Sequence, residues 1–376
     1  MNKILKLLAA FIAVTGITFA DTALTESLSV SGFVDMSYTD GDNGKESTSG
    51  IDQVEVDFTF NNGGPVTGQL DIEYVNKDAN LSLNVEEAYI NYALAESGIV
   101  TVGRFETMLL QDASEPTGLY QYSNAYDFYG SNLNQKLYDL GDQGIKFSNG
   151  GWAISLVDNG DGKIGDGNTT ATDGNGDYAY EVSYSGKLSD TVTGFIGGRF
   201  TEYNNSNNDS DILNLHLTHE EGPWVVGGEY VTSDYNTSTD NTEQMNNILM
   251  QSNVNVIGVG GLNNAPTTFT TPSTIQGEAD IVNDTTFTSV DVNLFSLFAN
   301  YSYSEINSVT VRYSNISGDA VANNNVRYDV DADKFTLAHN SALSDDLALV
   351  LEYSMEESDH QTLDQDTFAV ELLYAF

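Results

Sequence analysis

The feature that most constrains the fold of this chain is a strict two-residue alternation of apolar and polar side chains. Apolar residues or glycine occupy every second position across 28–38, and the same alternation runs through 53–60 and 68–74. A period of two with one apolar face is the pattern of a half-buried β-strand. Acids such as Glu55 and Asp57 occupy the polar positions, which indicates that this face meets water rather than a packed core.

The alternation recurs as far as the C-terminus, and about fourteen segments show it clearly. Region 241–290 is less regular, and we expect it to contain two more strands. Sixteen strands over 21–376 is ~22 residues per strand with its connection, which suits an outer-membrane barrel of antiparallel strands. No segment after the N-terminal region reaches ~18 consecutive apolar residues, so a transmembrane helix is excluded there.

Aromatic residues gather near the ends of the alternating segments, as in the interfacial girdles that flank a lipid-facing band. These residues are Tyr38, Phe60, Tyr74, Tyr92, Trp152, Trp224, Tyr353 and Tyr374. A soluble β-sandwich array or β-helix is the alternative, but the aromatic residues of a sandwich lie mostly inside. Connections also alternate between short (185–191) and longer ones (158–177). The predicted fold class is therefore all-β, a transmembrane antiparallel β-barrel of about 16 strands.

The first 20 residues have the composition of a secretory signal peptide. Two lysines precede an apolar run at 7–14, and the small residues Thr18 and Ala20 stand at −3 and −1 before Asp21. This run is too short for a spanning helix of ~20 residues, and the alternative is a short buried core helix. Because the chain has no cysteine, disulfides and a lipid anchor on cysteine are both excluded. We expect residues 1–20 to be cleaved and 21–376 to form a single outer-membrane barrel domain.

The charge of the chain is strongly negative, −42 in total. Removing the two lysines of the signal segment leaves 11 basic residues against 55 acids, a net charge of −44. No basic patch can form, so binding of nucleic acid is excluded. The acidity serves either solubility in a salty medium or a water-filled space that repels anions, and both can hold.

Four stretches occur in an order and spacing that resemble the Gram-negative porins. They are "EEAYINY" (86–92), "TVGRF" (101–105), "DQGIKFSNGGWAISLVDN" (142–159) and the terminal "FAVELLYAF" (368–376). The specific match covers about 86–159 and the C-terminus. The chain departs from the general porins in lacking their "PEFGG" signature, and its long loop is more similar to that of the OmpL-like group of porins.

The resemblance implies a barrel of 16 strands, often a homotrimer, in which the long loop after the fifth strand folds inward. Here that constriction loop is about 106–140. The terminal Phe376 resembles the signal by which such barrels engage the barrel-assembly machinery. The resemblance also implies a Gram-negative outer-membrane location, with contacts to membrane lipid and lipopolysaccharide.

A channel needs no catalyst but a polar waist whose fixed charges decide what passes. Its predicted residues are the loop acids Glu106, Asp112, Glu115 and Asp127, opposed by Arg104, Lys146, Arg199 and Arg312 on or near strands. A charge on the lipid face costs ~2–4 kcal/mol at the midplane, so a lumenal position is favoured for the four basic residues. The alternative is that these cations only neutralise neighbouring acids on the inner wall.

Three other groups of residues suggest weaker hypotheses. The loop aromatics Tyr120, Tyr122, Tyr126, Phe128 and Tyr129 either stack on sugars or pack the loop onto the wall. Asp173, Asn175 and Asp177 resemble the start of a calcium loop, but Tyr178 replaces its glycine and Tyr184 its glutamate, so no metal site is predicted. The histidines are His216, His219, His339 and His360; they are scattered, and no catalytic grouping is recognisable.

The sequence therefore predicts an outer-membrane porin for passive diffusion of small hydrophilic solutes and ions, with a preference for cations. Neither enzymatic activity nor a cofactor is expected. Two alternatives remain open. One is a substrate-specific channel for a sugar or small metabolite, and the other is a non-conducting barrel with a structural or adhesive role.

Overall fold

The computed structural model describes residues 22–42, 47–77, 80–109, 121–126, 128, 142–158, 178–202, 209–236, 287–322, 327–358 and 364–376. These residues form strands and one 3₁₀ turn, η1 (Ala95–Ser97). The strands are β1 (Thr22–Ala23), β2 (Leu28–Gly41), β3 (Thr48–Asn61), β4 (Val66–Lys77), β5 (Asn80–Ala93), β6 (Ile99–Phe105), β7 (Asp142–Asn149), β8 (Trp152–Asp158), β9 (Tyr178–Lys187), β10 (Val192–Glu202), β11 (Asp209–Glu221), β12 (Trp224–Asn236), β13 (Phe287–Ser302), β14 (Asn307–Ala322), β15 (Arg327–Ala342), β16 (Leu347–Ser358) and β17 (Gln365–Ala375). Within the described ranges, no helix is long and apolar enough to cross a membrane.

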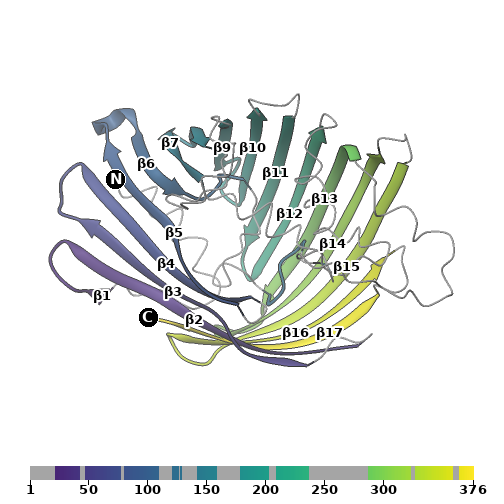
Figure 1. Cartoon of the computed structure of the whole chain (residues 1–376). Helices are drawn as coiled ribbons and strands as arrows, with labels where there is room; N and C mark the ends of the chain where they lie inside the picture. Colours follow the sequence, from purple (N-terminus) through teal and green to yellow (C-terminus); the bar gives the residue numbers. More distant parts are fainter. Residues whose placement is uncertain are drawn as a thin grey trace.

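Strands β2 to β17 form one closed antiparallel sheet, in which each strand pairs with the next along the chain. The ring closes where β17 pairs with β2, with Tyr374 opposite Val34 (Figure 1). Short β1 lies beside the start of β2. Closure leaves no strand edge with unpaired backbone groups, which is the condition for a sheet to span lipid. The predicted all-β barrel of about 16 strands is confirmed.

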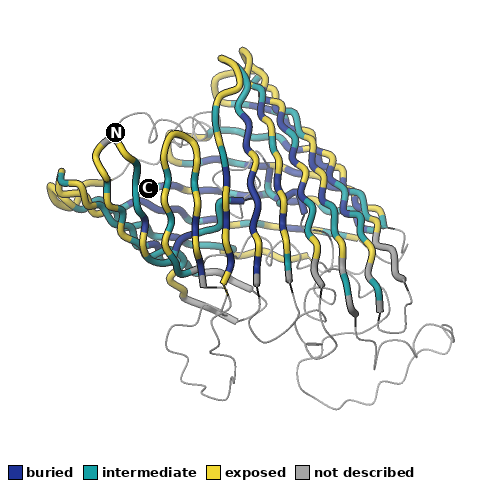
Figure 2. Tube along the Cα trace, turned by 90° about the horizontal axis from the view of Figure 1, so that it is seen from above, coloured by how far each residue is buried: buried dark blue, intermediate teal, exposed yellow. Residues whose placement is uncertain are grey.

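Side chains alternate along the strands with their polar members inside. On β9, Tyr180 and Val182 are exposed, whereas Ala179, Glu181 and Ser183, which alternate with them, are buried. Figure 2 shows the same alternation of buried and exposed positions along many strands. Apolar residues outside and acids inside are the reverse of a soluble sandwich. This arrangement is favourable only where lipid surrounds the barrel.

The connections alternate in length as the sequence indicated. Turns such as 150–151 and 222–223 join strands at one end, while the long connection 106–141 lies at the other. All sixteen barrel strands lie outside 237–286, because β12 ends at Asn236 and β13 begins at Phe287. The two strands expected in 241–290 are therefore not needed for the total. The rest of that region lies outside the described residues, as does the segment 1–20 that is predicted to be a signal peptide.

The loop after β6, the fifth strand of the barrel, folds onto the inner wall. Leu109, Ala125, Tyr126 and Phe128 form one buried cluster with the inward apolar residues of the opposite strands. The wall members of this cluster are Phe195, Ile212, Val231, Leu294 and Ile316. Gly197 of β10 admits the loop, since a Cβ there would lie 2.6 Å from a methyl carbon of Leu109. The described part of the loop confirms the predicted inward fold.

Candidate channel interior

The inner face of β2 to β5 is lined with carboxylates. On β3, Glu55 and Asp57 point inward, and they stand directly opposite Glu73 and Asp71 on β4. Glu55 and Asp71 are buried, while Asp57 and Glu73 are half-buried. Facing pairs in an antiparallel sheet have Cβ atoms ~4.5–5.5 Å apart, so like charges meet at close range here. The four strands contain a single basic residue, Lys77, at the end of β4.

Two β-bulges add further acids to this wall. Between β4 and β5 the register shifts, so that Asp71 is opposed by both Glu86 and Glu87. Between β2 and β3 a second shift inserts Asp52, which lies within electrostatic range of Asp35. A bulge places an extra residue in one strand and re-aims its side chain. Each bulge therefore adds a carboxylate that strict alternation would have turned outward.

A second group of acids continues the wall at the closure of the barrel. Asp35 of β2 and Glu371 of β17 are buried and interact with each other, and Asp52 lies beside them. Oδ1 of Asp35 and Oε1 of Glu371 have no hydrogen-bond partner among the described residues. The acidic wall thus runs without interruption over β17, β2, β3, β4 and β5. We call the set Asp35, Asp52, Glu55, Asp57, Asp71, Glu73, Glu86, Glu87 and Glu371 the acidic wall.

The inward basic residues lie on other strands, close to the loop or to acids. Nη1 of Arg199 on β10 is 2.9 Å from Oε1 of Glu181 on β9, and both side chains are almost fully buried. Lys146 on β7 lies 4.5 Å above the ring of Phe105. Lys334 on β15 is buried, with its Nζ 6.0 Å from the ring of Phe128. Lys146 also lies within electrostatic range of Glu87 of the acidic wall, whereas Arg199 and Lys334 are held against Glu181 and near the ring of Phe128.

Arg312 on β14 and Glu352 on β16 hold the returning part of the loop. Nη2 of Arg312 donates to Ser123 Oγ and to the Asn124 carbonyl, both at 3.0 Å. Oε2 of Glu352 accepts from the backbone N–H groups of Tyr122 and Ser123, at 2.9 and 3.2 Å. Charge-assisted bonds of this kind are roughly twice as strong as neutral ones. We call these four bonds the loop clamp.

The start of the loop has its own anchor on β9. Glu181 accepts hydrogen bonds from the Thr107 hydroxyl at 2.6 Å and from the Met108 N–H at 3.3 Å, in addition to its pairing with Arg199. Farther along, the Tyr126 hydroxyl donates to Glu229 of β12 at 3.3 Å. The described parts of the loop therefore have hydrogen bonds to the wall on β9, β12, β14 and β16.

The eight predicted constriction residues divide into four groups, of which the last contains Arg104 alone. Lys146, Arg199 and Arg312 lie on the inner face. Glu106 lies at the start of the loop, where its N–H donates to Glu87 at 2.9 Å. The remaining loop acids, Asp112, Glu115 and Asp127, lie outside the described residues, so their place at the waist stays a prediction.

Arg104 differs from its predicted lumenal position. The register pairs it with Ala88 and Gln143, and alternation along β6 puts it on the same face as Val102, which is 53% exposed on the outside. Its Nε donates to the Glu86 carbonyl at 2.9 Å. Arg104 is the last residue but one of β6, so a long side chain can reach the polar membrane edge from there.

The described loop aromatics pack against the wall. Tyr126 and Phe128 belong to the buried cluster, with 0% and 2% exposure. Tyr122 reaches across to β2, where its hydroxyl lies 3.3 Å from Ser37 Oγ, and burial raises the pKa of its phenol. Tyr120 and Tyr129 lie outside the described residues. The described members support wall packing rather than a sugar-stacking surface.

The remaining weak hypotheses gain no support. Asp173, Asn175 and Asp177 lie outside the described residues, as does His360. His216 faces inward and stacks on Phe195, with ring centroids 4.8 Å apart, whereas His219 is half-buried and its Nε2 lies 3.5 Å from Oε2 of Glu221. Across the described ranges, no three acidic or histidine side chains converge in a way that suits a metal ion.

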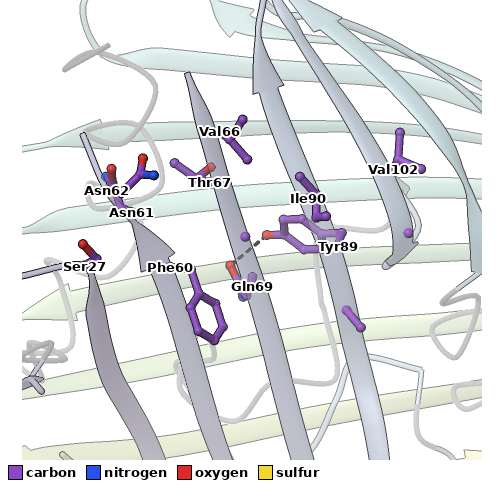
Figure 3. A pocket seen from close by; sticks show the side chains of 13 residues that line it. Ser27, Phe60, Asn61, Asn62, Val66, Thr67, Gln69, Tyr89, Ile90 and Val102 are labelled. Atoms are coloured by element: carbon purple, nitrogen blue, oxygen red, sulfur yellow. Dashed lines mark hydrogen bonds between the residues drawn. The ribbon is translucent and has the colours of Figure 1, made fainter. Parts of the chain in front are cut away.

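A hollow of about 760 Å³ lies over β3 to β6, near the short turns. The side chains of Phe60, Val66, Ile90 and Val102 line it and are all exposed on the outer face (Figure 3). Gly68 explains the hollow, since it stands between Phe60 and Ile90 in the register and has no side chain. The hollow is apolar and lies on the lipid side, apart from the acidic wall.

Comparison with solved structures identifies the architecture. The porin "Salmonella typhi OmpF complex with Daunomycin" matches with a TM-score of 0.61 and 12% identity, over 95% of this chain and 100% of that one. The fold is that of a Gram-negative outer-membrane porin. An anion-selective porin from Comamonas acidovorans matches with a TM-score of 0.56 and 14% identity, over 93% and 99%.

A third porin-like neighbour is the outer membrane channel DcaP of Acinetobacter baumannii, with a TM-score of 0.56 and 12% identity over 95% and 100% of the two chains. No family model and no curated protein matches the sequence. Identities this low extend the likeness to the fold and not to a solute. The charges of the interior must therefore be read from this chain's own residues.

Several interior residues were missed by sequence reasoning. Glu86 was read as part of a motif and not as a wall acid, because a bulge leaves no mark in a simple alternation. Glu181, Glu229 and Glu352 were missed because their partners are loop residues distant in sequence. One usable signal existed for the last three: each is an acid at an inward strand position flanked by outward apolar residues or, on one side of Glu229, by a glycine.

Proposed function

We propose that this chain forms a water-filled channel in the Gram-negative outer membrane, through which small hydrophilic solutes diffuse with a preference for cations. The observation that carries the proposal is the acidic wall, which faces the lumen on five adjacent strands. The inward cations Arg199, Arg312 and Lys334 are buried against Glu181, the loop and Phe128 respectively. Fixed charges along a pore attract counter-ions and repel co-ions.

The fold alone does not set the sign of selectivity, since the porin of similar fold from Comamonas acidovorans is anion-selective. The experiment is the reversal potential of the purified protein in planar bilayers under a tenfold potassium chloride gradient. We expect a potential that reports a preference for potassium. Preference for chloride would contradict the selectivity, and absence of any conductance would support a non-conducting barrel.

A substrate-specific channel is the second candidate, and it differs in having a binding site at the waist. Solute-dependent interruption of single-channel current by sugars would support that candidate. The proposal also includes export with cleavage after Ala20, assembly through Phe376 and trimer formation. A structure of similar fold, the outer membrane protein OmpT of Vibrio cholerae, is a trimer form. Mass measurement of the membrane-extracted protein and chemical cross-linking test cleavage and trimerisation.

A further inference from the structure

The inward cations Lys146, Arg199, Arg312 and Lys334 are not equally open to the lumen. Arg199, Arg312 and Lys334 are 2%, 3% and 4% exposed, whereas Lys146 is half-buried. The alternation along β7 fixes the direction of Lys146, because its neighbours Ile145 and Phe147 are 48% and 40% exposed on the outer face. The exposed part of the Lys146 side chain therefore faces the inside of the barrel.

The three covered cations belong to the attachment of the loop. Arg199 pairs with Glu181, which also accepts hydrogen bonds from the start of the loop. Arg312 donates to the returning part of the loop, and Nζ of Lys334 lies 6.0 Å from the ring of Phe128. A cation covered in this way meets the loop and the wall rather than a solute, so its role is structural.

The surroundings of Lys146 are different. Its Nζ lies 4.5 Å above the ring of Phe105, the last residue of β6. An aromatic face attracts an ammonium group without neutralising its charge. The acids within electrostatic range are Glu87 of the acidic wall, Glu181 and Glu106. Lys146 thus places a positive charge beside the β5 end of the acidic wall.

We propose that Lys146 is a specificity-determining residue of the channel, which weakens the attraction of the acidic wall for cations and leaves anions partly permeant. The proposal rests on the proposed function, because it requires ions to pass along the acidic wall. Fixed charges of both signs along a pore act on a passing ion together. A positive charge at the end of a row of carboxylates lowers the negative potential there, most strongly for Glu87.

The first experiment compares reversal potentials in planar bilayers under a potassium chloride gradient. Lys146→Met should raise the permeability ratio of potassium to chloride by about two- to threefold at ~0.1 M salt. The increase should shrink towards 1 M salt, where the Debye length falls from ~10 Å to ~3 Å. Lys187→Met removes the same charge from the exposed end of β9 and should leave the ratio unchanged.

The second experiment puts charge back at the same position. The chain has no cysteine, so Lys146→Cys provides a single reactive thiol. Modification by 2-aminoethyl methanethiosulfonate adds a positive charge and should restore the wild-type ratio. Modification by 2-sulfonatoethyl methanethiosulfonate adds a negative charge and should raise the ratio above that of Lys146→Met. Lys334→Cys should react at least about tenfold more slowly, because protein covers this position.

The ratio of Lys146→Met overturns the proposal if it equals that of the wild type, and so does a ratio that ignores the sign of the added group. Equal reaction rates of Lys146→Cys and Lys334→Cys would show that Lys146 is not distinguished by exposure. If Lys146→Met does not insert, the two adducts of Lys146→Cys decide the question. A wild-type preference for potassium with no effect at Lys146 rejects this inference alone. A wild-type preference for chloride rejects the cation-preferring channel itself.

Discussion

Glu352 accepts a hydrogen bond from the backbone N–H of Tyr122 at 2.9 Å, although the two residues are 230 positions apart. The contact joins β16 to the loop that follows β6. The same carboxylate oxygen also accepts from Ser123, so a single buried side chain holds two successive backbone groups. The loop is thus anchored on the side of the barrel away from the strand that carries it in.

Glu352→Gln should loosen the loop clamp, because an amide oxygen accepts these bonds without charge assistance. The loss is ~1 kcal/mol, which corresponds to about a fivefold increase in the time that the segment spends detached. Single-channel recordings should show more frequent current fluctuations. Glu305→Gln makes the same change in the exposed turn between β13 and β14 and should leave the recordings unchanged. Identical noise in both variants would argue against the clamp.

Deleting 108–128 should raise single-channel conductance without abolishing the barrel. The deletion removes Leu109, Tyr126 and Phe128. These side chains pack against the inner wall and take no part in the backbone hydrogen bonds between the barrel strands. Heat-modifiable migration on gels tests whether the barrel has formed. Unchanged conductance in a folded deletion variant would mean that the loop does not narrow the permeation path.

Glu181 and Arg199 should differ in how much stability each contributes. Arg199→Met leaves Glu181 with the donors Thr107, Met108 and Ser155, while Glu181→Leu removes the acceptor of all of them. Breaking a buried pair costs ~3–5 kcal/mol, so we expect Glu181→Leu to be at the upper end and Arg199→Met at the lower end. Urea unfolding in lipid vesicles gives both values, and the reverse order would refute this account of the anchor.

A charged side chain placed on the outer face should destabilise the barrel more strongly the closer it lies to the membrane midplane. Ile196 lies midway along β10 and is 59% exposed, and Ile196→Arg should destabilise the barrel by ~2–4 kcal/mol in lipid. Leu188→Arg, in the exposed turn after β9, should cost only ~0–1 kcal/mol. Equal costs at the two positions would be inconsistent with a membrane boundary between them.

Much of the barrel could be predicted because its signal is local. Each strand of an antiparallel barrel shows its inner and outer faces as alternate residues, so 28–38 and 178–184 reveal both faces without knowledge of their neighbours. Alternation alone also places Lys146, Arg199 and Arg312 on the polar face of their strands. It does not place Arg104, where Val102 and Phe105 give conflicting faces, and there the cost of charge in lipid was the sole basis of the prediction.

The chemistry of the interior could be predicted only in part. Glu55, Asp57, Asp71 and Glu73 were visible as acids at polar positions, but their meeting in facing pairs depends on the register between β3 and β4. Asp52 and Glu86 turn inward because of bulges, and a bulge exists only relative to a partner strand. The partner strand is in the same sequence, but the alternation within each strand does not show the register between them.

By itself, the sequence determined a barrel of about sixteen strands with a strongly acidic, water-facing interior. Alternation and composition are properties of the chain that need no long-range contact. Only the tertiary structure decided which acids face one another and which cations are buried. It also decided where the loop is held, by Arg312 and Glu352 on strands far along the chain. Those relationships arise when the sheet closes, because closure brings together residues that no local pattern relates.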